Sequence, residues 1–183
     1  MPVNTFTTID NPAATTGTTL AFDINNVGQI VGQFSDASGT HGFLLSGGTF
    51  TMIDDPLTSG SNTRAFAIND AGLIVGTFTR GNSHGFLLSG GVFTTIDDPF
   101  ATLGTEASGI NASGQIVGHF NDLSAGGNHG FLRNTDGTFI TLDVPLATRT
   151  FAEGINDAGQ VVGFFEEAGG AHGFLYSGGA SGT

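Results

Sequence analysis

Residues 21–34 read Ala-Phe-Asp-Ile-Asn-Asn-Val-Gly-Gln-Ile-Val-Gly-Gln-Phe, and similar stretches return three times along the chain. The later copies cover residues 65–78, 107–120 and 152–165, so they begin 44, 42 and 45 residues apart. Periods between about 20 and 50 residues are typical of propellers, solenoids and other repeat arrays. The repeat therefore determines the fold class before any single element is assigned.

Each copy of this stretch predicts two short strands joined by a tight turn. Gly28 lies in the turn and is glycine in every copy, as the left-handed position of a hairpin loop requires. A second repeated glycine lies inside the second strand, where it is unfavourable unless a bulge or a neighbouring backbone needs the room. We expect such close packing at Gly32, Gly76, Gly118 and Gly163.

Two further strands complete each repeat. The third opens with His-Gly-Phe, as at residues 41–43, and the fourth resembles Thr-Phe-Thr-Met-Ile-Asp at residues 49–54. Thr, Phe and Ile favour strands, whereas the Asp-X-Pro that follows ends each strand in a turn. The unit is thus a meander of four short antiparallel strands, which is the sequence pattern of a propeller blade.

The two ends of the chain predict how the blades are joined. A spare copy of the fourth strand lies at residues 5–10, while the last repeat stops near residue 179 without one. We expect the spare strand to complete the last blade, which would close the ring and leave no uncapped sheet edge. The prediction is an all-β, four-bladed β-propeller of four-stranded antiparallel blades, closed by the N-terminal strand.

This propeller is predicted to be a single domain over residues 1–183. Its repeats cover approximately residues 19–56, 63–99, 105–145 and 150–179, with residues 5–10 as the closing strand. In this arrangement residues 21–25 and their equivalents form the innermost strand and line the central channel. Phenylalanine, with 17 copies, is expected to be the main filler between blades.

Composition limits the partners. The chain has 16 acidic residues against four arginines and no lysine, and its formal charge is -12. Such a charge repels nucleic acids and anionic membrane surfaces, so we expect neither as a partner. The absence of cysteine excludes disulfides and thiolate metal sites, and no run of 18 apolar residues predicts membrane insertion. We expect a monomer.

Several motifs together resemble the HAF-repeat family of probable extracellular bacterial proteins. They are the Gly-Ile-Asn stretches at residues 109–118 and 154–163, the four His-Gly-Phe triplets and the four Asp-X-Pro turns. The resemblance covers essentially all of residues 5–179. It implies an extracellular or cell-surface location, although the first residues show no export signal, and it implies no catalytic residues.

Four repeated histidines suggest two interpretations. They are His41, His84, His129 and His172. Symmetry would place them on equivalent spots, which suggests a metal ring, but the outer position of the third strand would hold them too far apart to share an ion. We therefore predict structural histidines that bond an Asp or Asn of an adjoining turn. The unrepeated His119 is predicted to lie at the surface or on a blade flank.

The repeated carboxylates are likewise predicted to be structural. Asp10, Asp54, Asp97 and Asp143 each precede a proline by two residues, which favours Asx-type turns. Asp55 and Asp98 extend two of them into acidic pairs that could hold calcium through oxygen ligands or serve acid/base roles. No other cofactor is predicted.

A ligand site is expected where the repeats differ. On the inner strand, charged side chains replace uncharged equivalents at Asp23, Arg64, Glu106 and Glu153, and these four residues are the predicted ligand-binding cluster at one channel mouth. The alternative is a set of solvated strand ends. The loops at residues 35–40, 79–83, 121–128 and 166–171 also vary, and loops on rigid scaffolds often carry recognition.

Three functions remain open at this stage. The favoured one is a binding or scaffold module whose ligand is a glycan or a protein, held at the channel mouth or the loops. The second is a hydrolase or lyase that uses the acidic cluster. The third is a purely structural repeat, stabilised by calcium. No catalytic residue is predicted, so a binding role is favoured over an enzyme.

Overall fold

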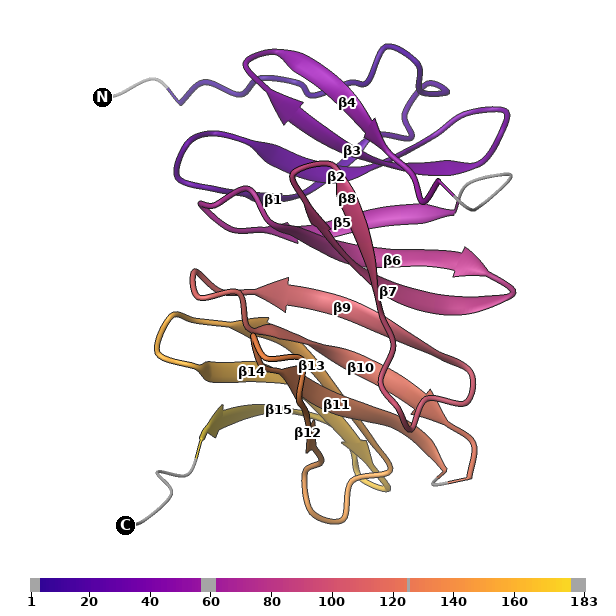
Figure 1. The fold of residues 1–183 in the computed structure, drawn as a ribbon, viewed down its shortest axis with the longest axis vertical. Helices are drawn as coiled ribbons and strands as arrows, with labels where there is room; N and C mark the ends of the chain where they lie inside the picture. The colour runs from indigo at the N-terminus through magenta and orange to yellow at the C-terminus, as the bar shows by residue number, and fades with distance from the viewer. Residues whose placement is uncertain (1–3, 57–61, 125, 179–183) are drawn as a thin grey trace.

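A computed structural model describes residues 4–56, 62–124 and 126–178, and all of its regular elements are strands (Figure 1). No helix long enough to cross a membrane occurs in these residues. The predicted repeat end at residue 179 and part of the loop at 121–128 lie outside them. The strands are β1 (Leu20–Ile24), β2 (Ile30–Ser35), β3 (Thr40–Ser46), β4 (Thr49–Ile53), β5 (Thr63–Ile68), β6 (Ile74–Arg80), β7 (Asn82–Ser89), β8 (Val92–Ile96), β9 (Gly104–Ile110), β10 (Ile116–Asp122), β11 (Gly127–Arg133), β12 (Phe139–Leu142), β13 (Arg149–Ile155), β14 (Gln160–Glu167) and β15 (Gly170–Ser177).

Each repeat folds into the predicted antiparallel meander, which we call a blade. Blade 1 comprises β1–β4, blade 2 β5–β8, blade 3 β9–β12 and blade 4 β13–β15. A single parallel bridge between Ser83 and Gly104 joins blades 2 and 3, so the hydrogen bonds define three sheets. The blades follow one another along the long axis of the molecule (Figure 1).

The predicted closure into a four-bladed ring is wrong for the single chain, because the sheets are open. Residues 5–10 form no strand, Phe6 is 95% exposed, and β15 forms a free edge of blade 4. The start of the chain is fastened to blade 1, where the Asn11 N–H donates to Thr19 Oγ1 at 3.0 Å. The two termini lie at opposite ends of the molecule (Figure 1), so the spare strand is remote from the blade it was expected to complete.

The glycines inside the second strands serve the predicted close approach. In each blade the inner strand has a register shift against its neighbour, and the bulged residues are Phe22, Phe66, Ser108 and Glu153. A Cβ added at Gly118 would overlap the carbonyl oxygen of Glu106, and the equivalent glycines face the same clash. The bulge therefore leaves no room for a side chain at this position.

The hydrophobic core lies between successive blades. Val31 and Ile53 of blade 1 pack with blade 2, Val75 and Ile96 of blade 2 pack with blade 3, and residues of blades 3 and 4 form a third cluster. Five phenylalanines are among the largest fully buried side chains, as expected for the main filler: Phe34, Phe43, Phe78, Phe86 and Phe131. Each blade is stable only against its neighbours, as in other repeat proteins.

A ladder of asparagines links the blades at the ends of the inner strands. Asn25 Nδ2 donates to the Asn69 carbonyl at 3.1 Å, Asn69 Nδ2 to that of Asn111 at 3.0 Å, and Asn111 Nδ2 to that of Asn156 at 3.2 Å. Residues from all four inner-strand ends line one hollow of about 200 Å³. The inner strands therefore converge on a common side of the molecule.

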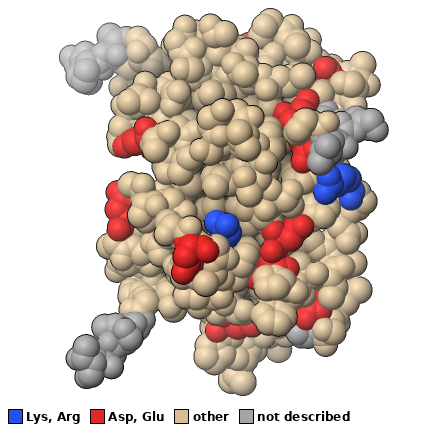
Figure 2. Space-filling model, in the orientation of Figure 1, with Lys and Arg blue, Asp and Glu red and all other residues tan. Residues whose placement is uncertain are grey.

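Acidic side chains are spread over the surface. Figure 2 shows Asp and Glu in several separate groups on one face, with few basic side chains among them. The acidic side chains on this face therefore do not form one patch.

Candidate functional site

Asp23, a member of the predicted cluster on the inner strands, is held by backbone donors. Its carboxylate accepts hydrogen bonds from the backbone N–H groups of Ile24 and Ile68, both at 2.8 Å. The second bond crosses from blade 1 to blade 2, so this carboxylate fastens two blades together. Its role in the structure is to satisfy backbone donors.

The other three members of the cluster influence one another electrostatically. Burial raises the pKa of Glu106, the nearby Glu153 carboxylate adds to the rise, and the Arg64 guanidinium offsets part of it. Burial also raises the pKa of Glu153, although its side chain still contacts solvent. Both carboxyl groups are therefore stronger bases than ordinary glutamates.

His119 is an unpredicted member of this site. It lies opposite Glu106 in the β9–β10 ladder, so the two side chains start from neighbouring positions on one face of the sheet. Both line a small pocket of about 140 Å³. Burial lowers the pKa of His119 to about 4, and its Nδ1 is buried without a hydrogen-bond partner among the described residues.

The sequence contained one signal for His119, namely that it breaks the repeat. Its ring packs edge-on against Phe151 of blade 4, with centroids 4.9 Å apart. Of the two predicted positions, the blade flank is therefore the one observed, because the neighbouring blade covers the ring. A carboxyl group with a raised pKa beside a neutral imidazole is an arrangement suited to proton transfer.

Three of the four repeated histidines bond a repeated aspartate. Nδ1 of His41 lies 2.8 Å from Asp54, Nδ1 of His84 lies 3.0 Å from Asp97, and Nδ1 of His129 lies 2.8 Å from Asp143. His172 differs, since its nearest carboxylate is that of Glu167 at 3.4 Å. No group of three potential metal ligands gathers anywhere in the described residues.

At Asn11 and Asp98 the Asx turn is made by the residue that follows the repeated aspartate. Asn11 Oδ1 accepts the Ala13 N–H and Asp98 Oδ1 accepts the Phe100 N–H, each at 2.9 Å. The turn role predicted for Asp10 and Asp97 was therefore placed one residue early. Asp54, Asp97 and Asp143 are instead hydrogen-bonded to histidines.

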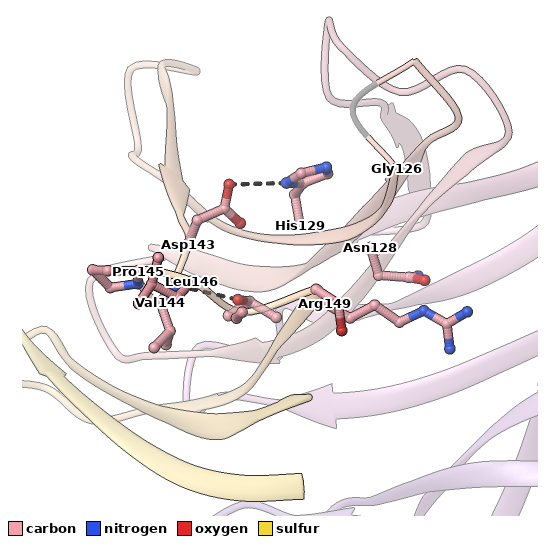
Figure 3. A pocket seen from close by; sticks show the side chains of 11 residues that line it. Gly126, Asn128, His129, Asp143, Val144, Pro145, Leu146 and Arg149 are labelled. Atoms are coloured by element: carbon pink, nitrogen blue, oxygen red, sulfur yellow. Dashed lines mark hydrogen bonds and ion pairs between the residues drawn. The ribbon is translucent and has the colours of Figure 1, made fainter. Parts of the chain in front are cut away.

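A pocket lies at the connection between blades 3 and 4 (Figure 3). Its volume is about 410 Å³, within the range of small-molecule sites. The walls come from the start of β11 and from the connector between β12 and β13. The lining residues are Gly126, Asn128, His129, Asp143, Val144, Pro145, Leu146, Ala147, Thr148, Arg149 and Thr150.

Polar groups of different kinds face this pocket. His129 and Asp143 form their ion pair on one wall, and the Nε2 of His129 is buried without a hydrogen-bond partner in the described chain (Figure 3). Arg149 is half-exposed and pairs with Glu166 at 3.3 Å. Asn128 lines both this pocket and the smaller one that contains Glu106, so the two pockets adjoin.

Leu146 is the feature that distinguishes this connector. Its φ of 71° makes it the one non-glycine residue with positive φ in the described part of the chain. Its side chain is 93% exposed at the pocket, beside Pro145. An L-residue in this region is strained by about 1–2 kcal/mol, and such strain clusters at functional sites.

The sequence identified only one wall of this pocket. The variable loop at residues 121–128 supplies Gly126 and Asn128. The connector itself was not predicted as a site, since Asp143 and Pro145 repeat the motif of every other connector. The strained conformation of Leu146 has no sequence signal.

The fold is similar to that of two solved lyases. Streptogramin B lyase, a β-propeller, matches with a TM-score of 0.54 and 17% identity, over 94% of this chain and 58% of that chain. Virginiamycin B lyase from Staphylococcus aureus matches with a TM-score of 0.50 and 10% identity, over 88% of this chain and 56% of that chain. No protein-family model and no curated protein matches the chain. At these identities the likeness shows the propeller-type fold alone.

Proposed function

We propose that the chain is a binding module that holds a sugar unit of a glycan in the pocket between blades 3 and 4. The observation that carries the proposal is Leu146, an apolar side chain held exposed in a strained conformation at this pocket. A strained, exposed leucine does not stabilise the isolated fold. Its position is explained if the side chain contacts a ligand.

The chemistry of the pocket favours a ligand that is both apolar and rich in hydroxyl groups. Pro145 and Leu146 offer an apolar surface, while Asn128 and Arg149 offer amide and guanidinium donors. A sugar ring presents C–H faces and hydroxyl groups in this combination. The pocket volume of about 410 Å³ suits one or two rings.

Replacing the leucine tests the proposal. A glycan array would first identify a ligand, and calorimetric titration would then compare the chain with Leu146→Gly. Glycine relieves the backbone strain but removes the apolar contact, so we expect unfolding stability to rise by about 1 kcal/mol while affinity falls about tenfold. A glycine variant that binds as tightly as the parent chain would refute the proposal.

Phe100 provides the matched control. It follows the proline of the preceding connector, is 66% exposed, and does not have positive φ. Phe100→Gly therefore removes a similar apolar area from an equivalent place without touching the pocket. We expect it to leave glycan affinity unchanged.

A lyase activity is the second candidate, favoured by the Glu106–His119 pair. In an elimination, a base takes a proton from one carbon, the electrons of that C–H bond form a double bond, and the leaving group departs with its own electron pair. The raised pKa of Glu106 makes its carboxylate a suitable base, and the lowered pKa keeps His119 neutral. The two lyases of similar fold add support at the level of architecture.

The substrates named for these two lyases are the first to assay. An elimination product carries a new double bond and no added water, so mass spectrometry separates it from a hydrolysis product. We expect Glu106→Gln to abolish turnover, while Leu146→Gly leaves the chemistry intact. Absence of any product at high protein concentration would reject the lyase and leave the binding proposal untouched.

A further inference from the structure

The trailing face of blade 4 is more exposed to solvent than the equivalent face of blades 1 to 3. It is formed by Val162, Leu175 and Asn156. The equivalents of Val162 in blades 1 to 3 are fully buried by the next blade, whereas Val162 is 51% exposed. Leu175 is 63% exposed, and Asn156 is exposed while Asn25, Asn69 and Asn111 are buried. This face has the chemistry of a blade interface.

The leading face of blade 1, formed by Ala21 and Ile24, is the complementary surface. The alanines equivalent to Ala21 in blades 2 to 4 are completely buried against the preceding blade, while Ala21 is exposed. Ile24 is 60% exposed, although its equivalents Ile68 and Ile110 are buried. The two ends of the blade series therefore expose the two opposite surfaces that pack together at every junction between blades.

The incomplete strand order supplies an independent observation. Within the described residues blade 4 comprises three strands, and residues 5–9 repeat the fourth-strand sequence without forming a strand. In blade 1 the third and fourth strands pair Gly42 with Ile53 and Leu45 with Phe50. The same register would pair Gly173 with Ile9 and Tyr176 with Phe6.

This register would also supply the missing partners of two side chains. The third-strand phenylalanines Phe43, Phe86 and Phe131 each contact a fourth-strand phenylalanine with ring centroids 5.1–5.3 Å apart. The counterpart of Phe174 would be Phe6, which is 95% exposed. Likewise, His172 would bond Asp10, as His41 bonds Asp54.

We propose that two copies of this chain form a closed ring of eight blades, in which residues 5–9 of each copy complete blade 4 of the other. The trailing face of one copy packs on the leading face of its partner, and a two-fold axis generates both contacts. The asparagine ladder would continue across each junction, from Asn156 Nδ2 to the Asn25 carbonyl of the second copy.

The arc of the chain favours two copies over closure within one. Its four blades match 58% of the streptogramin B lyase chain, so they span somewhat more than half of that propeller. Two such arcs make a slightly larger ring, and propellers of up to about eight blades are common. Closed two-fold symmetry is also the commonest arrangement among homo-oligomers.

The oligomeric state in solution tests the proposal directly. Each chain has a mass of 18.6 kDa, so light scattering or sedimentation of the 183-residue chain should give twice this value. Each copy carries a formal charge of -12, so association is expected to strengthen as salt screens the repulsion. A monomer throughout, or open polymers in place of a dimer, would overturn the two-copy ring.

Two substitutions should separate association from folding. Phe6→Asp alters a side chain that the single chain leaves exposed, and we expect it to weaken dimerisation at least about 30-fold while leaving the monomer folded. Gly173→Ala is similar, because an added Cβ has no neighbour closer than 3.8 Å in the single chain. In the dimer that Cβ would meet the incoming carbonyl of Ile9, just as one at Gly85 would lie 2.7 Å from the Ile96 carbonyl.

A cysteine pair tests the register. The chain contains no cysteine, so Phe6→Cys combined with Tyr176→Cys introduces the only two thiols. Oxidation of dilute protein should give a dimer on a non-reducing gel, and Phe6→Cys with Leu175→Cys serves as the control on the opposite face of β15. A disulfide formed within one chain would show closure of the single copy and overturn the proposal.

Discussion

Removing one side chain of the asparagine ladder should measure how strongly adjacent blades are coupled. Asn69 is buried, donates from Nδ2 to the Asn111 carbonyl at 3.0 Å, and accepts the Ala71 and Leu73 N–H groups at 3.1 and 3.0 Å. Asn69→Ala loses all three hydrogen bonds. At about 1 kcal/mol each, the free energy of unfolding should fall by about 3 kcal/mol.

Asn156→Ala is the matched control. Asn156 occupies the same place in blade 4 and accepts two similar backbone bonds, but its side chain is exposed and not covered by another blade of the described chain. Water replaces the lost bonds there, so we expect a cost of about 1 kcal/mol. The difference of about 2 kcal/mol reports the bond between blades together with its burial.

Urea unfolding followed by circular dichroism would measure both values. Both substitutions would be made in the Phe6→Asp variant, so that association between copies does not contribute to the measured stabilities. With a slope of about 2–3 kcal/mol per molar urea, Asn69→Ala should lower the midpoint by roughly 1 M. Equal midpoints for Asn69→Ala and Asn156→Ala would refute the reasoning, since the bond between blades would then contribute nothing measurable.

Three further outcomes follow from the packing and the pKa shifts. Gly118→Ala should prevent folding or destabilise it by about 3 kcal/mol or more, because its Cβ would overlap the Glu106 carbonyl, and expression with a thermal melt would detect this. Glu106→Gln should raise the melting temperature at pH 7 but not at pH 4, because burial disfavours the charged carboxylate only above its raised pKa. His119→Phe, which copies Phe164 of the last repeat, should lose less stability than the parent chain between about pH 6.5 and pH 4. In this range His119 of the unfolded parent chain binds a proton, whereas the buried His119 of the folded chain stays neutral. Acid-unfolding curves that run parallel for the two proteins would contradict this.

Local features were predictable because the repeat fixes them within one blade. The four-strand meander, the bulge at Gly118 and the phenylalanine core depend on strand propensity, turn chemistry and contacts between neighbouring strands. The pairing of repeated histidines with carboxylates was also within reach of the sequence, since both belong to the same blade. The Asx turns at Asn11 and Asp98 were displaced by one residue because two adjacent side chains with carbonyl oxygens offered the same chemistry.

The site was only partly predictable, since its members come from different blades. Asp23, Arg64, Glu106 and Glu153 all lie on inner strands, but the carboxylate of Asp23 accepts a hydrogen bond from the backbone N–H of Ile68 in the next blade. His119 joined the site because Phe151 of the next blade buries it. Burial of this kind depends on how closely two blades approach, which no pattern within one repeat encodes.

By itself, the sequence determined that this protein is all-β, that it repeats a propeller blade, and which residues fill the space between blades. Only the tertiary structure decided that the single chain remains open, that the connector after blade 3 lines a pocket of about 410 Å³, and that Leu146 is strained there. The physical reason is that the course of a repeat protein follows from the small rotation between successive units. That rotation accumulates along the whole chain and is set by side-chain packing between blades.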